Sequence, residues 1–310
     1  LCLTGCGASW TVATSSLDRV VLTVSGEGGD VWLAGGGQGN GAPSLVRRLH
    51  GGAWSSPSGV SGDETLWWIS SGFIVGERGA IYRIAGDGLE KMSSPVTNTL
   101  YGVWGASTDE VWAVGGSPLG NGENDVILRF DGSTWSRVTV AQPLGVAYFK
   151  IWGTARDDVW IVGQQGVTLH FDGSAWSRVM APTRSTLLTV VGRARDDVWA
   201  VGGPPAALLH WDGAAWQDEP LPFEASGLTG VSFAPDGALY VAGLAGVRWR
   251  RVNGTWTDDS ESPVLGDLHA VWAGASEAWA VGGNYLAVDP GTVRRGIVAR
   301  FGSGAAPELE

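Results

Sequence analysis

The sequence has very little cysteine, histidine and basic charge. Of its 310 residues, two are cysteine and four are histidine. Lysine and arginine together number 20 against 31 acidic residues, which gives a net charge of −11. Because nucleic acids and anionic lipid headgroups bind basic surfaces, this balance argues against nucleic acid as a partner and against direct attachment to an anionic membrane.

Long apolar stretches are also missing, although the sequence is rich in apolar residues. No run of about 18 apolar residues occurs, so no membrane-spanning helix is expected. Hydrophobic residues nevertheless make up 44% of the chain, with 18 tryptophans and 49 glycines. Indole rings suit packing between flat surfaces and glycine suits tight turns, so one closed all-β domain can account for a chain of this length.

One aromatic position recurs along nearly the whole chain. The gaps between its successive copies are 41, 39, 48, 39, 41 and 39 residues. Internal repeats of this period are typical of solenoids and propellers. The seven copies are Trp32, Phe73, Trp112, Trp160, Trp199, Tyr240 and Trp279.

Each repeat contains four short apolar runs, seen most clearly in residues 103–135, 151–179 and 190–216. Short runs rich in valine and aromatic residues, bounded by glycine and aspartate, indicate strands, and Asp-Gly between the third and fourth runs indicates a hairpin. Four antiparallel strands per forty residues is typical of a propeller blade. The fold class we predict is all-β, a seven-bladed β-propeller with four antiparallel strands per blade.

The two ends of the chain complete each other. The seventh repeat has strands near 268–273, 278–283 and 297–301, but no tryptophan strand follows. The missing strand matches the N-terminus, where 7–12 resembles 173–178. We therefore expect the N-terminal strand to close the last blade, which leaves no open sheet edge. Residues 7–304 then form one propeller, and 305–310 a flexible tail.

The repeat resembles the kelch repeat, in which hydrophobic residues precede a double glycine and an aromatic and a tryptophan follow. Here that pattern is Val111-Trp112-Ala113-Val114-Gly115-Gly116 followed by Phe130 and Trp135, with a spacing about one residue short. The Asp-Gly-x-x-Trp hairpin is similar to the Asp-box of sialidase-like propellers, except that the serine is missing and the glycine comes one place early. Both resemblances imply a propeller and neither implies an activity.

The N-terminal Leu3-Thr4-Gly5-Cys6 resembles the lipobox of bacterial lipoproteins. This resemblance implies that residues 1–6 are the remnant of a signal peptide and that Cys6 is lipidated. Gly7 after the cysteine favours the outer membrane, so we expect an exported protein that is lipid-anchored there or secreted. The alternative is a Cys2–Cys6 disulfide or two free thiols.

Acids and histidines recur at repeat positions, and we interpret them as structural. An aspartate in a hairpin turn caps its own backbone, and a feature present in most blades is more simply structural than catalytic. We therefore predict no metal site and no cofactor, although a structural calcium ion stays open. The residues concerned are Asp109, Asp157, Asp158, Asp196, Asp197, Asp131, Asp172 and Asp212, together with His50, His170 and His210, which we place at one repeat position.

A functional site is expected where the repeat is broken. Three loops between second and third strands are enlarged, at 35–44, 115–126 and 282–296, and they share a face with the links between blades. Acidic residues of those links are Asp218, Glu219, Glu224, Asp258, Asp259, Glu261 and Asp267. First strands start at this face beside the central channel, where non-repeating side chains predict a ligand site. The candidate residues are Trp67, Tyr101, Lys150, Thr229 and His269, and the alternative is ordinary loops and channel residues.

No enzyme signature is present among the motifs: the chain has neither a zinc-type His-Glu pairing nor a Gly-x-Ser-x-Gly elbow. We therefore favour a monomeric, non-catalytic binding or scaffold protein that holds a protein or a glycan at the cell surface. The alternatives are a lectin-like propeller and a polysaccharide-degrading glycosidase or lyase. A lectin predicts several similar pockets, whereas a glycosidase predicts one pocket with two carboxylates.

Overall fold

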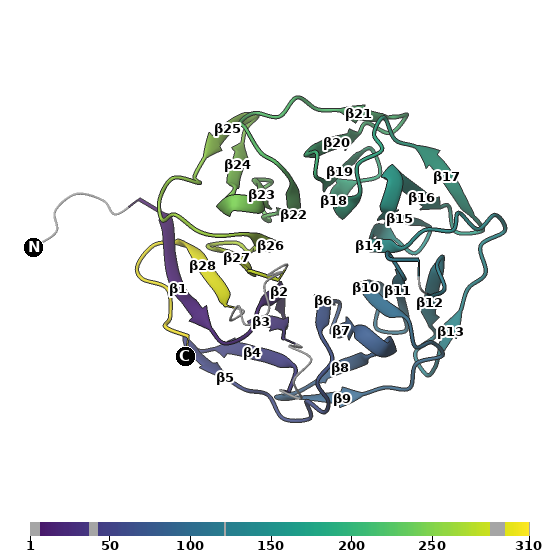
Figure 1. Cartoon of the computed structure of the whole chain (residues 1–310), viewed down its shortest axis with the longest axis horizontal. Helices are drawn as coiled ribbons and strands as arrows, with labels where there is room; N and C mark the ends of the chain where they lie inside the picture. The colour runs from purple at the N-terminus through teal and green to yellow at the C-terminus, as the bar shows by residue number, and fades with distance from the viewer. Residues whose placement is uncertain (1–6, 37–42, 121, 286–294, 310) are drawn as a thin grey trace, which may run out of the picture.

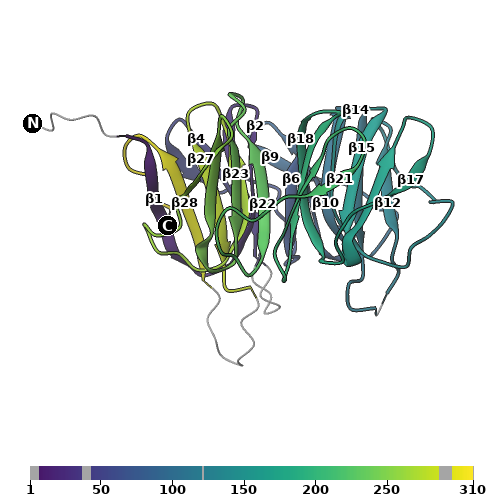
Figure 2. The ribbon, with the colours of Figure 1, turned by 90° about the horizontal axis from the view of Figure 1, so that it is seen from above.

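The computed structural model describes residues 7–36, 43–120, 122–285 and 295–309, and these form seven four-stranded antiparallel sheets. Figure 1 shows the sheets arranged as blades around a central channel, with the first strand of each blade innermost. Figure 2 shows the ring from its side, with the strands running across its thickness. The predicted seven-bladed propeller is thereby confirmed.

Blades 1 to 3 follow one another along the chain. Blade 1 contains β2 (Val21–Glu27), β3 (Asp30–Gly35), β4 (Leu45–His50) and β5 (Ala53–Ser55). Blade 2 contains β6 (Leu66–Ser70), β7 (Phe73–Gly76), the short 3₁₀ turn η1 (Glu77–Gly79), β8 (Ile81–Ala85) and β9 (Gly88–Lys91). Blade 3 contains β10 (Thr99–Ser107), β11 (Glu110–Gly116), β12 (Val126–Phe130) and β13 (Trp135–Arg137).

Blades 4 to 6 repeat the arrangement. Blade 4 contains β14 (Tyr148–Ala155), β15 (Asp158–Gly163), η2 (Gln164–Gly166), β16 (Val167–Phe171) and β17 (Trp176–Met180). Blade 5 contains β18 (Leu187–Ala194), β19 (Asp197–Gly202), β20 (Ala207–Trp211) and β21 (Trp216–Asp218). Blade 6 contains β22 (Leu228–Phe233), β23 (Leu239–Gly243), η3 (Leu244–Gly246), β24 (Arg248–Val252) and β25 (Thr255–Asp258).

Blade 7 is built from both ends of the chain. Its inner strands are β26 (Leu268–Ala273), β27 (Ala278–Gly283) and β28 (Gly296–Gly302), and its outer strand is β1 (Ser9–Leu17). Trp10 pairs with Phe301 in the antiparallel register. Closure by the N-terminal strand, which the sequence predicts, is therefore confirmed, and Figure 1 shows β1 lying against β28.

The residues after β28 lie against the ring, although their composition predicts a flexible tail. Leu309 is buried in the apolar cluster between blades 7 and 1, and its amide donates to the Ala13 carbonyl at 3.4 Å. The amide of Ala306 donates to Thr11 Oγ1, and Trp54 Nε1 donates to the Pro307 carbonyl. These hydrogen bonds attach residues 306–309 to β1 and to blade 1. The burial of the apolar side chain of Leu309 stabilises this arrangement.

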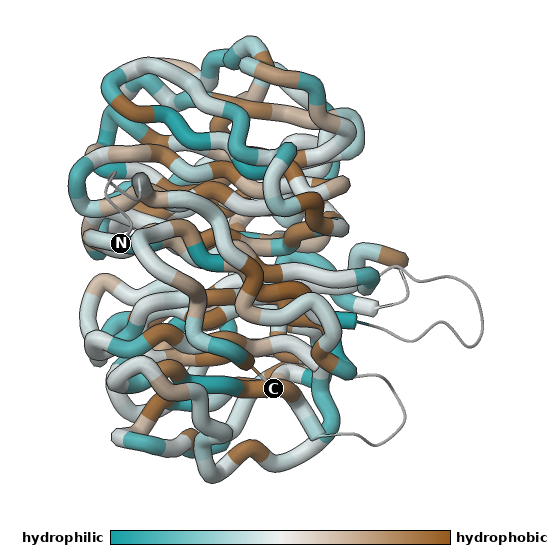
Figure 3. Tube along the Cα trace, turned by 90° about the vertical axis from the view of Figure 1, so that its left-hand side faces the viewer, coloured by the Kyte–Doolittle hydropathy of each residue, from teal (hydrophilic) through white to brown (hydrophobic). Residues whose placement is uncertain are grey.

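The core lies between the blades. Within the described residues, seven apolar clusters occur, one at each interface between neighbouring blades. Figure 3 shows apolar stretches in brown along the strands and polar residues in teal at many of the turns. The aromatic column belongs to these interfaces: Trp32, Trp112, Trp160 and Trp279 are each at most 2% exposed.

A glycine on the first strand lets neighbouring blades approach closely. A Cβ added at Gly153 would lie 2.8 Å from the Trp104 ring of the preceding blade, and one at Gly192 would lie 2.7 Å from the Trp152 ring. The first strands of blades 3 and 4 contain Trp104-Gly105 and Trp152-Gly153, and in each case the tryptophan packs against the glycine of the next blade. Within the described residues, no helix is long and apolar enough to span a membrane.

Candidate functional site

Each innermost strand contains a β-bulge near its start. In blade 3, Leu100 pairs with Gly115 and Gly102 with Val114, so that Tyr101 has no partner in the register. A bulge leaves one residue outside the ladder and re-aims its side chain, and bulges are frequent beside functional sites. The residues skipped by the seven registers are Leu22, Trp67, Tyr101, Phe149, Leu188, Thr229 and His269.

All seven bulged residues line one cavity of about 380 Å³ at the mouth of the channel. Tyr285, just after β27, and Pro118 and Leu119, from the loop between β11 and β12, complete its wall with Lys150. Figure 2 shows that this loop projects from one face of the ring. The cavity therefore opens on the face that carries the loops between second and third strands.

Aromatic rings form a continuous arc around this cavity. The ring of Trp67 lies 5.1 Å from that of Tyr101 and 5.0 Å from that of Tyr285, both in edge-on geometry. Tyr101 in turn lies 5.0 Å from Phe149, and His269 lies 6.2 Å from Tyr285. Burial raises the pKa of Tyr101 to about 12, so its phenol is neutral at physiological pH.

Lys150 brings an amine into this apolar setting. Its side chain is 9% exposed, Nζ donates to the Tyr101 carbonyl at 2.8 Å, and Nζ lies 4.2 Å from the centre of the Trp68 ring. A Cβ at Gly102 on β10 would lie 2.9 Å from the Cα of Lys150 on β14, so only glycine lets these two strands lie so close together. Burial lowers the pKa of the Lys150 amine to about 7.

Two polar side chains form the opposite part of the wall. Thr229 Oγ1 donates to the carbonyl of Leu268 at 2.7 Å, which ties blade 6 to blade 7. His269 Nε2 lies 3.1 Å from the Gly283 carbonyl, and burial lowers the pKa of the imidazole. Both side chains are therefore anchored by backbone carbonyls while they border the cavity.

The structure brings together all five candidate residues, Trp67, Tyr101, Lys150, Thr229 and His269. Sequence reasoning missed Leu22, Phe149 and Leu188, and it named the loops that hold Pro118, Leu119 and Tyr285 without naming these residues. The signal for three of them was present, because Leu22, Phe149 and Leu188 occupy the same place in their repeats as Tyr101. Most of the loops at 35–44 and 282–296, and the predicted lipidation site Cys6, lie outside the described residues.

The recurrent charged residues form a structural column in every blade. The third-strand residue opposite each column aromatic is basic or histidine: Arg48, Arg83, Arg129, His170, His210, Arg250 and Arg300. Each is paired with a carboxylate, at 2.6 to 3.3 Å. Of the acids that the sequence analysis interprets as structural, Asp158 and Asp197 belong to this column, and their contacts with His170 and His210 fit that interpretation.

One alignment made from the sequence is wrong. Arg48, not His50, stands opposite Trp32 and so corresponds to His170 and His210. The β4–β5 hairpin pairs His50 with Ala53 across two turn residues, whereas Phe171 and Trp176 are joined by four. This shorter turn shifts the register by two residues when the hairpins are used for alignment.

The acids outside this column also have backbone or ion-pair partners. Asp131, Asp172 and Asp212 each accept two backbone amides of their own hairpin turns, which makes them turn caps. Of the link acids, Asp267 accepts the Ala245 amide, whereas Asp259, the column partner of Arg250, also accepts Trp10 Nε1. Among the described residues, no group of three or more metal-ligating side chains is present.

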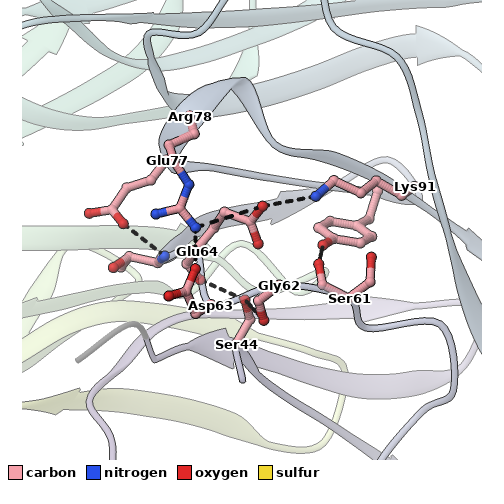
Figure 4. Close-up of polar contacts among 10 residues, drawn as sticks. Ser44, Ser61, Gly62, Asp63, Glu64, Glu77, Arg78 and Lys91 are labelled. Atoms are coloured by element: carbon pink, nitrogen blue, oxygen red, sulfur yellow. Dashed lines mark hydrogen bonds and ion pairs between the residues drawn. The ribbon is translucent and has the colours of Figure 1, made fainter. Parts of the chain in front are cut away.

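A polar cluster fastens the link between blades 1 and 2 (Figure 4). Glu64, which is 6% exposed, accepts Lys91 Nζ at 2.8 Å, and its backbone carbonyl accepts Ser44 Oγ at 2.6 Å. Arg78 pairs with Asp63, and Glu77 accepts the Thr65 amide at 3.0 Å. These contacts join the link to both blades, through Ser44 of blade 1 and through Glu77, Arg78 and Lys91 of blade 2, so their role is structural.

The seven four-stranded sheets define a seven-bladed β-propeller, an architecture that carries many unrelated functions. No family model matches the sequence, and no curated protein matches it at the sequence level.

Solved structures share the fold at low identity. A catalytically inactive virginiamycin B lyase from Staphylococcus aureus with quinupristin is similar with TM-score 0.72 and 12% identity over 95% of this chain and 99% of that one. YCF48 bound to D1 peptide is similar with TM-score 0.69 and 15% identity over 95% and 97%. The RRP9 WD40 repeats match with TM-score 0.70 and 9% identity over 95% and 97%. At these identities, the likeness shows the fold alone.

Proposed function

We propose that the protein is a non-catalytic binding protein that receives an apolar or aromatic group of a protein partner in the cavity at the channel mouth. The observation that carries the proposal is the ring of bulges, through which every blade directs one side chain into the same cavity. Mostly apolar walls with a few fixed polar groups are the usual composition of a binding pocket.

The surroundings of the cavity favour a protein partner. Leu119 at its border is 86% exposed, and an exposed apolar side chain beside an apolar cavity suits a protein contact. One structural neighbour, YCF48 bound to D1 peptide, supports this direction. We extend this proposal to the envelope of a bacterium, where lipidated Cys6 would anchor the propeller through the end of β1.

A lectin-like role is the second candidate. Trp67 and Tyr101 supply aromatic faces, while Thr229 and His269 supply polar groups, and this combination also suits sugar rings. A glycosidase would use two carboxylates in the same pocket. The described residues that line the cavity include no carboxylate, and catalysis is therefore one of the outcomes that the test examines.

The test uses a displayed peptide library and a glycan array, both screened with the whole protein. Affinity for enriched peptides is then compared between the wild type and Leu188→Trp, which narrows the cavity from a half-buried position. We expect Leu188→Trp to weaken binding by about tenfold or more. Met180→Trp is the matched control, because Met180 is 69% exposed on β17 outside the cavity, and it should leave binding unchanged.

The outcomes separate the candidates. Enriched peptides whose binding is lost in Leu188→Trp support the proposal, whereas glycans with the same loss support the lectin instead. The proposal is overturned if Leu188→Trp and the wild type bind alike, or if the protein turns over a polysaccharide. Membrane association of the complete precursor in a Gram-negative host, lost in Cys6→Ala, tests the anchor separately.

A further inference from the structure

Two arginines break the repeat at the interface between blades 5 and 6. Arg251 stands opposite Leu239 in the register of blade 6. The same place in blades 3, 4, 5 and 7 holds an aromatic residue: Phe130, Phe171, Trp211 and Phe301. Arg193 occupies a place that is Thr154 in blade 4. Departures from a repeat that the fold does not need are where a site is expected.

Arg251 takes over the packing role of the missing aromatic ring. In blade 4, Phe171 packs on Trp112 of the preceding blade, with ring centroids 5.3 Å apart. In blade 6, the Arg251 guanidinium lies 5.2 Å from Trp199 of the preceding blade and 5.8 Å from Trp256. The planar guanidinium therefore replaces a ring as a stacking group, but unlike a ring it carries a positive charge and five hydrogen-bond donors.

A groove of about 560 Å³ opens beside this guanidinium. Its walls come from the turn between β22 and β23 and from the hairpin between β24 and β25, so it lies on the face opposite the channel-mouth cavity. Arg193, Arg251 and Phe233 contribute to its walls together with the turn residues Asp236 and Asn253. The guanidinium of Arg193 lies over the Phe233 ring at 4.9 Å.

The two guanidinium groups differ in their partners. Arg193 Nε donates to Asp197 Oδ2 at 2.7 Å, so its charge is balanced within the blade. Arg251 has neither an ion pair nor a hydrogen bond among the described residues, and its Nε is buried without an acceptor there. The guanidinium of Arg251 is held in place by two indole rings and has unused hydrogen-bond donors, so it can bind a planar acceptor.

The charges of the groove favour an anion beside Arg251. Asp236 belongs to the wall, with Oδ1 accepting the Ala238 amide at 3.0 Å. The Arg251 guanidinium has no ion pair among the described residues and attracts an anion, while the Asp236 carboxylate in the same groove opposes one. The volume exceeds that of a bare ion and leaves room for the body that carries the charged group.

We propose that this groove is a second binding site, specific for a carboxylate-bearing group that makes a bidentate ion pair with Arg251. The carboxylate is carried either by an acidic amino acid side chain or by a uronic acid, and the shared chemistry is the planar monoanion. The site is separate from the channel mouth, so either site can exist without the other.

The test titrates the whole protein with N-acetyl-glutamate amide and with glucuronate, while NMR shifts of the tryptophan indole protons are followed. The neutral counterparts are N-acetyl-glutamine amide and glucose. We expect at least one acid to bind about tenfold more tightly than its neutral counterpart, since an ion-paired hydrogen bond contributes more than a neutral one. The acid that binds identifies the source of the carboxylate.

Arg251→Phe is the decisive variant, because it restores the residue type found at this place in blades 3, 4 and 7 and so retains the stack on Trp199. It should fold normally and lose the preference for the acid. Asp236→Asn should strengthen acid binding, and inorganic phosphate should bind more weakly than the better acid. The proposal is overturned if neither acid is preferred over its counterpart, or if folded Arg251→Phe binds the acid as well as the wild type.

Discussion

Trp10 of the first strand pairs with Phe301 of the last, and their ring centroids lie 5.6 Å apart. This contact joins residues that are 291 positions apart in the chain, so it can form only when the ring is complete. Trp10 is 7% exposed, and the Arg248 guanidinium lies 5.5 Å from its ring. Closure of the propeller therefore depends on a few side chains of β1.

Trp10→Ala should consequently destabilise the protein by about 3–5 kcal/mol, the usual cost of removing a buried tryptophan from a core. Urea unfolding followed by circular dichroism measures this effect. Val12→Ala on the same strand is the control, because Val12 is 39% exposed and its loss should cost about 0.5 kcal/mol or less. Equal stabilities of the two variants would show that β1 does not close the ring.

The contact between Gly153 and Trp104 gives a second prediction. A Cβ at position 153 would lie 2.8 Å from the Trp104 ring and 2.5 Å from the Asp158 carbonyl oxygen, so Gly153→Ala overpacks the interface of blades 3 and 4. We expect a loss of about 1–3 kcal/mol in the free energy of unfolding. Gly7→Ala, where a Cβ meets nothing within 4 Å, should be neutral.

A double variant separates the two contacts of Gly153. Trp104→Phe should recover part of the stability of Gly153→Ala if the ring is the obstacle, because the two changes are then coupled. If the losses of unfolding free energy of the two single variants simply add in the double variant, the cost of Gly153→Ala comes instead from the contact with the Asp158 carbonyl.

Lys150 predicts an unusual dependence of stability on pH. Its pKa is lowered to about 7 by burial, whereas an unfolded lysine titrates near about 10.4. Between these values the unfolded state binds the additional proton, so the stability of the wild type should rise as the pH increases from about 7 towards 10. Lys150→Met removes this group and should give a flatter profile, whatever its absolute stability.

Chemical unfolding at several pH values between about 7.5 and 9.5 checks this slope, since the Tyr101 phenol titrates at higher pH and His269 at lower pH. Lys91→Met is the control and should retain the slope of the wild type, because the side chain of Lys91 is 43% exposed and its hydrogen bond to Glu64 raises its pKa rather than lowering it. Parallel profiles for the wild type and Lys150→Met would contradict the assignment.

The environment of Asp158 predicts how the stability of the fold changes at acid pH. Burial acts against its charge, yet hydrogen bonds from His170 and Thr154 hold the pKa of Asp158 below its usual value. A carboxylate of this kind stabilises the fold above about pH 4, and this contribution is lost as the pH falls through the lower pKa of the folded protein. Asp158→Asn should cost about 1–3 kcal/mol at neutral pH and should reduce the loss of stability in acid.

Asp157→Asn is the neighbouring control for this measurement. Asp157 is about half exposed and pairs with Arg195 at the surface, so its replacement should change the free energy of unfolding by about 0.5 kcal/mol or less. If both asparagine variants lose stability equally, the buried pair with His170 is not the cause.

Side-chain periodicity made the ring predictable from the sequence. Trp112 and its counterparts must recur wherever a blade buries both faces. The match between residues 7–12 and 173–178 predicted that the N-terminal strand closes the ring. The bulges were not predictable in the same way, because a skipped partner at Tyr101 changes the pairing of strands and leaves the apolar pattern intact.

Two other features depended on register. The position of His50 was misjudged because the β4–β5 turn is two residues shorter than the turn in blade 4. Arg251 was visible in the sequence as a departure from the repeat, but its meaning depends on Trp199 of the neighbouring blade, which only the folded ring brings beside it.

The seven bulges also bear on how such a protein changes over evolutionary time. Since Leu22, Phe149, Leu188 and their counterparts stand outside the pairing of the strands, each can be exchanged without altering the ladder that supports it. Seven single codons, one per blade, thus contribute to the shape and polarity of the cavity, together with Lys150 and the loop residues of its wall. Descendants of one ancestral gene can acquire different ligand preferences while the wheel around the channel stays the same.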